Sequence, residues 1–433
     1  MPARVVITGL GAVTPLGSNA QESFNRASKG ESGSTMIESF DTTGMPCRIG
    51  GEIKREPSLD IIGQTLPSQI DIRRLEKYTP RPVKFMIEAT AEAVTQAGLL
   101  SIPPQRMGVA LGYHGENPPV ADMMFIHRFY GPGKAQPWDM DGLSNAGGYP
   151  YFSFFRRKSD VAAALLGGIF NCKGPNISIA SACAAGAQAI GEAAGIIRDG
   201  AADVMIAGGC ESALNFMGFV GFVLIKAMSE KYTAPDKASR PFDRKRNGFV
   251  MSEGAGVVIL EELGHAKRRG ATILAEFLGY GSSADAYRIT DTHPKGEGAI
   301  IAMQAALEDA SLTTGDIDYI NAHGTSTVMN DQTETEAIKQ VFKERAASIA
   351  VSSNKSMIGH TIAAAGAIEC VLSTLGINES IILPTINYEN PDPKCNLNYV
   401  PNTALEKPHK RVLSNSFGFG GQNACLAIGK FEG

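Results

Sequence analysis

Two segments of the chain share one plan, in which a short apolar strand runs directly into a helix made largely of alanine and glycine. They are ISIASACAAGAQAIGEAAGII at 177–197 and IAVSSNKSMIGHTIAAAGAIECVLSTLG at 349–376. Side chains this small give a helix no wide polar face, so both helices can be buried on all sides. The repeated plan indicates a duplicated unit, in which each copy places a reactive side chain between its strand and its helix.

Short apolar runs alternate with helical patterns along the chain, and this alternation is typical of an α/β fold. We expect an N-terminal half over residues 1–264 and a C-terminal half over residues 265–433. Strands are predicted at Val5–Gly9, Met107–Leu111, Ile177–Ala180, Asp203–Ala207, Gly256–Leu260, Ile273–Tyr280, Tyr319–Ala322, Ile349–Ser352, Val412–Asn415 and Cys425–Ile428. Helices are predicted at Val83–Ala97, Ala184–Ile197, Gly298–Ala310 and His360–Leu375. The stretch 112–155, rich in Gly, Pro and aromatic residues, is predicted to be a long ordered loop.

Composition excludes several classes of function. The chain has 40 basic and 44 acidic residues, and its net charge of −4 gives no indication of nucleic-acid binding. No apolar stretch reaches the ~20 residues of a membrane helix, and no secretory signal pattern follows Met1. The 7 cysteines form no CxxC pair, which argues against a zinc site or a disulfide framework. A reducing compartment follows, and the cytoplasm is the expected location.

Cys183 is a candidate nucleophile because it stands where the strand at 177–180 gives way to the first alanine-rich helix. Free N–H groups and the dipole at a helix N-terminus stabilise a thiolate, so we expect a lowered pKa for this thiol. The same N–H groups can stabilise an oxyanion formed by attack at this point. A buried cysteine that only packs is the alternative, and we interpret Cys172, Cys370 and Cys425 in that way.

Two histidines occupy similar settings. His323 follows an apolar strand in DYINAHGTSTVMND, and His360 stands before the second alanine-rich helix in SSNKSMIGHTIAAAGA. A lone histidine is usually structural, but Cys183, His323 and His360 together form a set that suits acyl-thioester chemistry. A thiolate accepts the acyl group, and two imidazole N–H donors stabilise an oxyanion or an enolate.

The segment LSNSFGFGGQNACLAIG at 413–429 combines several glycines with two phenylalanines. It is either a plain glycine turn or a loop that closes on a ligand. In the second case a backbone N–H group points at the reacting carbonyl, and a phenylalanine acts as a gate. The residues alone leave both interpretations open.

A series of motifs resembles the β-ketoacyl-acyl carrier protein synthases, the elongating condensing enzymes of the thiolase superfamily. In order, the motifs are VVITGLGAVTPLG, SACAAGAQAIG, DVMIAGG.ES, SRPFDRKRNGFVMSEGAGVVILEELGHAKRRGA, NAHGTST..ND, SSNKSMIGH..AAAGAIE, LPTINYENPDPKCNLNYVPN and NSFGFGGQN, where dots mark omitted residues. They extend over nearly the whole chain, and the resemblance is weakest between Tyr113 and Phe155.

The resemblance implies a five-layered α-β-α-β-α thiolase fold of two similar halves, in a homodimer or a heterodimer. It implies that Cys183 receives an acyl chain from the phosphopantetheine arm of an acyl carrier protein. His323 and His360 would then stabilise the enolate that forms when malonyl-carrier protein loses CO2. Attack of this carbanion on the acyl-Cys183 thioester lengthens the chain by a β-keto unit. No metal and no redox cofactor are expected, because decarboxylation drives the reaction.

The resemblance also assigns supporting roles. The backbone N–H groups of Cys183 and Phe419 match the oxyanion hole, and the Phe419 ring matches the gate. Lys355 and Glu369 match the pair that organises the histidines. The residues expected to contact substrate are Thr325, Thr327, Phe417 and Gly115, of which the two threonines match the hydroxyls that hold the pantetheine arm.

The chain departs from the family pattern in places. Gly115, in GYHGEN, falls where a bulky aliphatic residue commonly closes the acyl pocket. The stretch MNDQTET at 329–335 is more similar to the ketosynthase subunit of type II polyketide systems. The resemblance implies chain elongation in fatty-acid or type II polyketide biosynthesis. These departures favour a specialised, polyketide-like pathway and a pocket for a longer, unsaturated or aromatic-type chain.

Carrier proteins are acidic, so a basic rim is expected to dock them. Arg156, Arg157 and Lys158 form a dense basic cluster, which is either this docking site or an ordinary solvated charge run.

Two alternative functions remain. A thiolase-type acyltransferase would carry a second reactive cysteine near its C-terminus. A chain-length factor, the silent partner in a heterodimer, would lack the nucleophile.

Overall fold

The structure is a computed structural model that describes residues 3–59, 79–99, 103–131, 137–147, 153–289 and 292–433. Among these residues the main sheet has ten strands, and they confirm every predicted strand, with ends that differ by a few residues. The strands are β1 (Val5–Val13), β4 (Met107–Gly112), β5 (Asn176–Ile179), β6 (Val204–Ser212), β7 (Glu253–Glu262), β8 (Ala275–Ala284), β9 (Tyr319–Asn321), β10 (Ala350–Ser352), β13 (Arg411–Phe417) and β14 (Gln422–Gly429).

The two halves of this sheet repeat one topology. Counted along the chain within each half, the spatial order is third, second, fourth, fifth, first, both for β5-β4-β6-β7-β1 and for β10-β9-β13-β14-β8. The halves join where β1 and β8 pair antiparallel at Val5↔Phe277, Val6↔Glu276 and Ile7↔Ala275. The shared order supports the duplication that the two alanine-rich segments predict.

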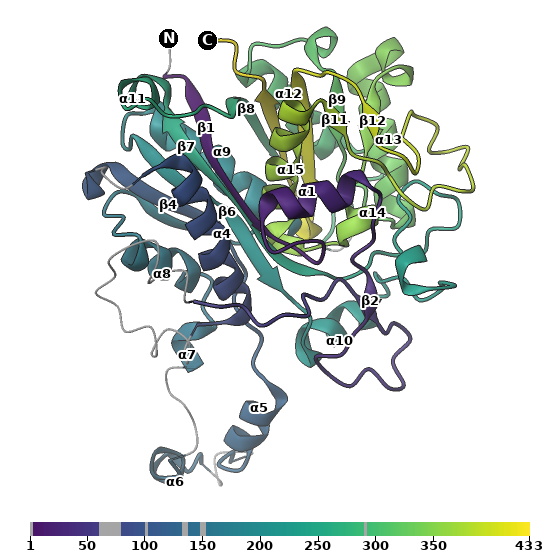
Figure 1. Ribbon diagram of the computed structural model, residues 1–433. Helices are drawn as coiled ribbons and strands as arrows, with labels where there is room; N and C mark the ends of the chain where they lie inside the picture. Colours follow the sequence, from purple (N-terminus) through teal and green to yellow (C-terminus); the bar gives the residue numbers. More distant parts are fainter. Residues whose placement is uncertain (1–2, 60–78, 100–102, 132–136, 148–152, 290–291) are drawn as a thin grey trace.

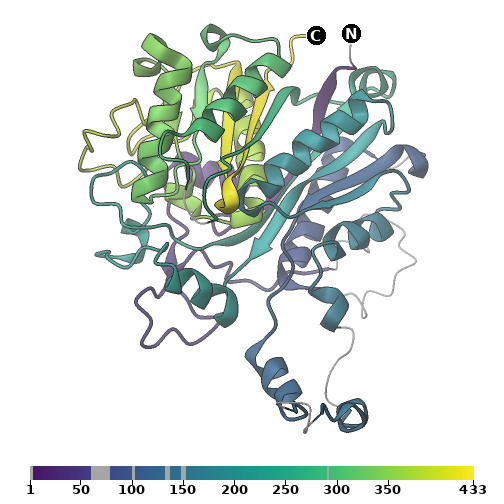
Figure 2. The ribbon, with the colours of Figure 1, turned by 180° about the vertical axis from the view of Figure 1, so that it is seen from behind.

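Helices form three layers around the two half-sheets. The central layer is α9 (Ala185–Arg198) with α15 (Ala365–Glu379), and these helices contact strands of both halves as well as each other. The outer layers are α4 (Arg81–Ala97) with α8 (Val161–Ile169) on one side, and α12 (Glu297–Asp309) with α13 (Val328–Phe342) on the other. The result is the expected order α-β-α-β-α, seen from two sides in Figures 1 and 2.

Small side chains let the two central helices meet closely. A β-carbon added at Gly186 of α9 would lie 2.6 Å from the carbonyl oxygen of Ala363 and 3.2 Å from the β-carbon of Ala367. Within the described residues, one helical segment, Ile362–Glu379, is long and apolar enough to cross a membrane, but 89% of it is buried inside the fold. It is the core helix of the second half.

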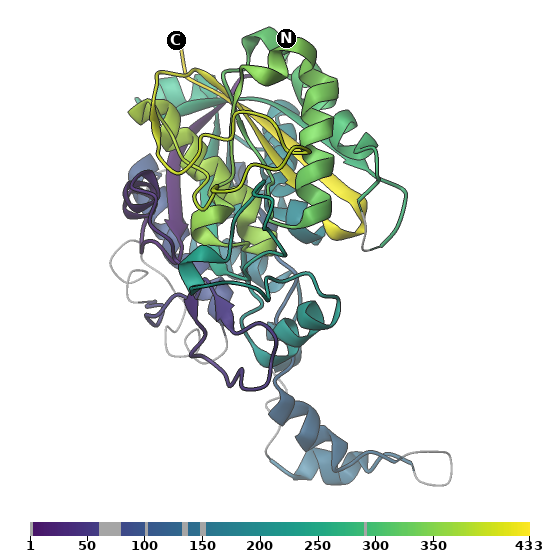
Figure 3. The same cartoon turned by 90° about the vertical axis from the view of Figure 1, so that its right-hand side faces the viewer.

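Two sequence predictions are wrong in detail. The helix predicted from His360 begins only at Ala365, because Ile362 takes a left-handed φ of 48° and forms a turn first. The predicted loop at 112–155 instead contains the helices α5 (Val120–His127), α6 (Met140–Asn145) and α7 (Ser153–Arg156). Residues 120–131 and 137–145, called the arm below, project from the body (Figure 3). The helices α5 and α6 of this arm have no buried side chains.

Candidate active site

Cys183 lies in the turn between β5 and α9. Ala182 adopts a left-handed φ of 49°, and the 3-10 turn Ala182–Ala184 leads into the helix. The sulfur interacts with the backbone N–H group of Cys183 itself and with that of Phe419, which lies in a separate turn after β13. The side chain is only 2% exposed, so a substrate must reach the sulfur through an internal cavity.

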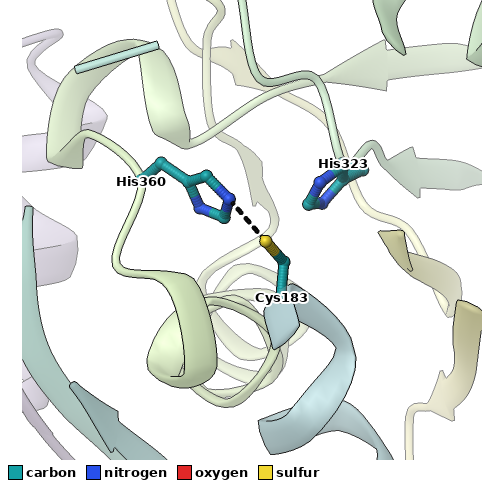
Figure 4. Close-up of side chains that lie close together, drawn as sticks. All are labelled: Cys183, His323 and His360. Atoms are coloured by element: carbon teal, nitrogen blue, oxygen red, sulfur yellow. Dashed lines mark hydrogen bonds between the residues drawn. The ribbon is translucent and has the colours of Figure 1, made fainter. Parts of the chain in front are cut away.

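His360 reaches this sulfur from the second half. Its backbone is held extended, because its N–H donates to the carbonyl of Val250 at 2.8 Å and its own carbonyl accepts from the N–H of Ser252 at 3.0 Å. The Phe249 ring meets the imidazole at 81°, with ring centroids 5.2 Å apart. In this position Nε2 of His360 lies 3.0 Å from Sγ of Cys183 (Figure 4).

The sequence analysis expected Cys183 and His360 at equivalent positions of the two repeated units, and the structure shows that they are not equivalent. The 3-10 turn Ile362–Ala364, whose first residue has a φ of 48°, repeats the turn Ala182–Ala184 in the other half. This places Ala363 at the position equivalent to Cys183. His360 lies two residues before its turn, so the two reactive side chains meet from different backbone settings.

His323 completes the set from the end of β9. Its ring faces that of His360 with centroids 5.4 Å apart and planes at 84°. One ligand atom each from Cys183, His323 and His360 lie within 4.8 Å of one another (Figure 4). The structure therefore brings together three residues that the sequence singled out from both halves.

The buried carboxyl group of Glu334, on α13, positions His323 and was missed by the sequence analysis. Its two oxygens accept hydrogen bonds from the backbone N–H groups of His323 and Gly324, each at 2.8 Å. Nδ2 of Asn415 donates to the same carboxyl group at 3.1 Å. Because Glu334 binds main-chain groups, no spacing of reactive side chains marks it. The sequence signal that could have identified Glu334 was a carboxyl group on the buried face of a helix.

Lys355 and Glu369 form a buried ion pair near the two histidines. Burial raises the pKa of Glu369 to about 7, against the opposing attraction of Lys355. Burial also lowers the pKa of His323 and the pKa of His360 well below the ordinary range, and the Lys355 charge acts in the same direction. Both imidazoles are therefore neutral at pH 7, and each has one donor and one acceptor nitrogen.

The expected lowering of the Cys183 pKa is wrong. Burial raises the pKa of this thiol to about 12, and Lys355 together with the two backbone N–H groups lowers it only in part. Desolvation disfavours the charged thiolate more than the helix terminus favours it. The resting pair is thus a neutral thiol beside a neutral imidazole.

A cavity of about 430 Å³ leads to the three side chains. Its wall includes Thr325, Thr327, Phe417 and Phe419, all of which the sequence analysis expected near substrate. The hydroxyl oxygens of the two threonines lie 3.0 Å apart. The Phe419 ring lies beside that of Phe222, with centroids 6.4 Å apart. The site therefore has polar groups along one wall and an aromatic side chain next to the sulfur.

Gly115 is not part of this cavity wall. Its backbone has a left-handed φ of 94°, and an added β-carbon would lie 2.2 Å from the carbonyl oxygen of Arg157. Backbone conformation and close approach thus explain a glycine here without reference to an acyl chain. The prediction of a pocket for a longer chain loses this support and stays a prediction.

The basic cluster at 156–158 is largely neutralised. Arg156 pairs with Glu116 at 2.8 Å, and Arg157 pairs with Asp122. Lys158 is exposed. Because both arginines form ion pairs with nearby acidic residues, the cluster offers less positive charge to a partner than the sequence indicated.

A duplicated five-layered fold that directs one cysteine and two histidines into one cavity defines a condensing enzyme of the thiolase type. Profiles described as β-ketoacyl synthase N-terminal and C-terminal domains match residues 3–266 and 274–389. The chain belongs to the β-ketoacyl synthase family and is an acyltransferase.

Individual relatives agree with this assignment. The 3-oxoacyl-[acyl-carrier-protein] synthase 2 of Coxiella burnetii is 41% identical over 99% of this chain and 98% of its own length. The protein of the same name from Synechocystis is 40% identical over the same shares. A β-ketoacyl synthase structure from Burkholderia phymatum has a TM-score of 0.85 and 32% identity, covering 99% of this chain and 100% of that one. A type II polyketide ketosynthase, solved with its acyl-carrier protein, has a TM-score of 0.85 and 33% identity over 100% of both chains.

Proposed function

We propose that this chain condenses malonyl-acyl carrier protein with an acyl chain held on Cys183, with loss of CO2, to give a β-ketoacyl-acyl carrier protein. One observation carries the proposal: Sγ of Cys183 lies 3.0 Å from Nε2 of His360, and His323 completes a set within 4.8 Å inside one cavity. Similarity to two proteins named 3-oxoacyl-[acyl-carrier-protein] synthase 2 supports the same reaction.

The first step loads Cys183. Its thiol proton passes to Nε2 of His360 as the sulfur attacks the thioester carbon of the acyl-carrier protein. The tetrahedral oxyanion accepts hydrogen bonds from the backbone N–H groups of Cys183 and Phe419. The C–S bond to the pantetheine arm then breaks, and the departing thiolate takes the proton back from His360.

The second step forms the new carbon–carbon bond. The thioester oxygen of the malonyl group accepts hydrogen bonds from His323 and His360, which stabilise the enolate left when CO2 departs. The enolate carbon attacks the acyl-Cys183 carbonyl, and the Cys183 thiolate leaves and takes up a proton from solvent. The pair Lys355 and Glu369 positions the histidines. These steps use no metal and no redox cofactor.

We place carrier-protein docking at the exposed end of the cavity wall. Ile225, Val328 and Met329 line the cavity and are 48%, 48% and 53% exposed, and the exposed Lys226 stands among them. Apolar side chains beside a basic one suit an acidic partner that inserts a long arm.

Lys226→Glu should therefore raise the KM for acyl-carrier protein about tenfold and leave kcat nearly unchanged, because a rim charge acts mainly on association. Lys158→Glu, the matched charge reversal in the cluster at 156–158, should change KM less than twofold. Steady-state kinetics with carrier-bound substrate measures both variants. A raised KM only in Lys158→Glu would return the docking site to that cluster.

We also propose a cytoplasmic location and a dimer. All seven cysteines are free and buried, and a thiol nucleophile needs a reducing compartment.

In a homodimer both chains would be active. The second candidate is the active subunit of a heterodimer, which is favoured by the likeness to the ishigamide ketosynthase/chain length factor, with a TM-score of 0.85 and 30% identity. The presence of Cys183 assigns this chain to the ketosynthase role in either case.

Intact-protein mass spectrometry after incubation with a panel of acyl-carrier proteins tests the function. We expect one acyl group per chain, lost in Cys183→Ala, and its conversion to carrier-bound β-ketoacyl product when malonyl-carrier protein is added. Retention of the acyl group by Cys183→Ala would refute the proposal. A best substrate among saturated C12–C16 chains would contradict the predicted specialised pathway but not the reaction.

A further inference from the structure

The three side chains at the end of the cavity are also a set of metal ligands. One thiol and two imidazoles are the donor types that Zn²⁺ takes in proteins. Their candidate atoms lie within 4.8 Å of one another. We propose that Cys183, His323 and His360 bind Zn²⁺ reversibly, and that the bound ion excludes the acyl substrate. Binding of the ion goes beyond the condensation and does not depend on it, whereas exclusion of the acyl substrate rests on the proposed function.

The geometry needs small adjustments. Tetrahedral Zn²⁺ with bonds of about 2.3 Å to sulfur and about 2.0 Å to nitrogen separates its ligand atoms by about 3.5 Å. The 3.0 Å separation of Sγ of Cys183 and Nε2 of His360 would widen slightly. The other separations, at most 4.8 Å, would close by about 1 Å. Rotations about side-chain bonds supply movements of this size.

The surroundings admit a cation. The 430 Å³ cavity provides an entry path and leaves the fourth coordination position open to water. The nearby ammonium group of Lys355 is paired with the carboxyl group of Glu369, which offsets part of its repulsion of a metal ion. Binding is a simple exchange, in which the Cys183 thiol releases its proton to solvent and its sulfur bonds to Zn²⁺.

The hydrogen-bond pattern indicates an inhibitory ion and not a permanent one. Histidines of lasting zinc sites usually donate their second ring nitrogen to a carboxylate or carbonyl, which fixes the ring. Here Nδ1 of His323 and Nδ1 of His360 are both buried without a hydrogen-bond partner among the described residues. Without that support, the ion is expected to exchange and to be removed by chelators.

Titration of the chelator-treated, full-length protein with Co²⁺ tests the site, since Co²⁺ replaces Zn²⁺ and absorbs when bound to thiolate. We expect one ion per chain with a thiolate-to-cobalt charge-transfer band that Zn²⁺ abolishes. Cys183→Ser should lose the band, and His323→Ala should weaken binding at least tenfold. The control Cys172→Ser changes a buried thiol that donates to the Phe170 carbonyl at 3.7 Å and lies outside the cavity wall, and it should bind as the wild type does.

A second measurement avoids variants that fail to fold. Zn²⁺ should slow alkylation of Cys183 by iodoacetamide in the wild-type protein at least tenfold, and EDTA should restore the rate. The inference is overturned if Cys183→Ser keeps the charge-transfer band, if the band never forms, or if Zn²⁺ leaves alkylation unchanged. Acyl loading in metal-free buffer is measured separately, so its failure would count against the condensation alone.

Discussion

The thiol of Cys183 and the imidazole of His360 lie 3.0 Å apart in surroundings that disfavour charge on either group. Burial raises the pKa of the thiol to about 12 and lowers the pKa of the imidazole. Proton transfer from sulfur to nitrogen would create two buried charges, so the resting pair stays neutral. Transfer becomes favourable as attack on a carbonyl moves negative charge to an oxyanion that two backbone N–H groups stabilise.

The alkylation rate of Cys183 by iodoacetamide should rise about tenfold per unit between about pH 7 and pH 10, because only the thiolate reacts. The rate rises with pH because the raised pKa of about 12 keeps most of the thiol protonated throughout this range, so each added pH unit increases the thiolate fraction. Intact-mass kinetics measures the rate, and Cys183→Ala corrects for reaction at the other cysteines. A plateau near neutral pH would mean that the helix terminus, and not burial, sets this pKa.

At the scale of elements, the contact between α9 and α15 sets the geometry of the site. The turns that precede these helices, Ala182–Ala184 and Ile362–Ala364, both begin with a left-handed residue. Gly186 and Ala367 allow the helices to approach until one turn packs against the other. The small residues of both helices therefore fix the distance between Cys183 and the segment that carries His360.

Gly186→Ala should lower the free energy of unfolding by about 1–3 kcal/mol, because the added methyl group overlaps the carbonyl of Ala363, 2.6 Å away. Gly195→Ala, in the same helix, meets nothing within 4 Å and should stabilise the protein by about 0.5–1 kcal/mol. Urea denaturation measures both variants. If both variants changed the free energy of unfolding equally and in the same direction, the close helix contact at Gly186 would not explain the effect.

At the scale of the whole molecule, the arm exposes several large apolar side chains. Met124, Tyr130, Trp138 and Met140 are 62%, 48%, 45% and 58% exposed. Methionine and aromatic side chains are enriched at protein interfaces, and a stable helix needs its apolar side chains covered. We therefore expect a second chain, either identical or related, to pack on the arm.

Met124→Glu combined with Met140→Glu should weaken the dimer at least a hundredfold, because two charges would have to be buried in an apolar contact. Ile301→Glu is the matched control, since Ile301 is 51% exposed on the outer helix α12. Analytical ultracentrifugation over a range of concentrations distinguishes the variants. Wild-type association of the arm variant, or dissociation of the control, would contradict this role for the arm.

Local sequence determined much of this protein. Apolar runs predicted the ten strands, and alanine and glycine marked two helices small enough to be buried. The position of Cys183 after a strand and before such a helix, with two histidines in similar settings, was enough to select the candidate site. These features depend on residues close together in the chain, where periodicity and side-chain size act directly.

Tertiary structure decided what depends on distant residues. Cys183 and His360 are 177 positions apart, and their burial by the surrounding fold reverses the pKa shift that the helix terminus alone would give. Glu334 acts through backbone N–H groups, Gly115 meets a carbonyl of another segment, and the arginines of the basic cluster find acidic partners across a loop. Desolvation and long-range contacts exist only once the chain has folded, so no local sequence pattern could have predicted them.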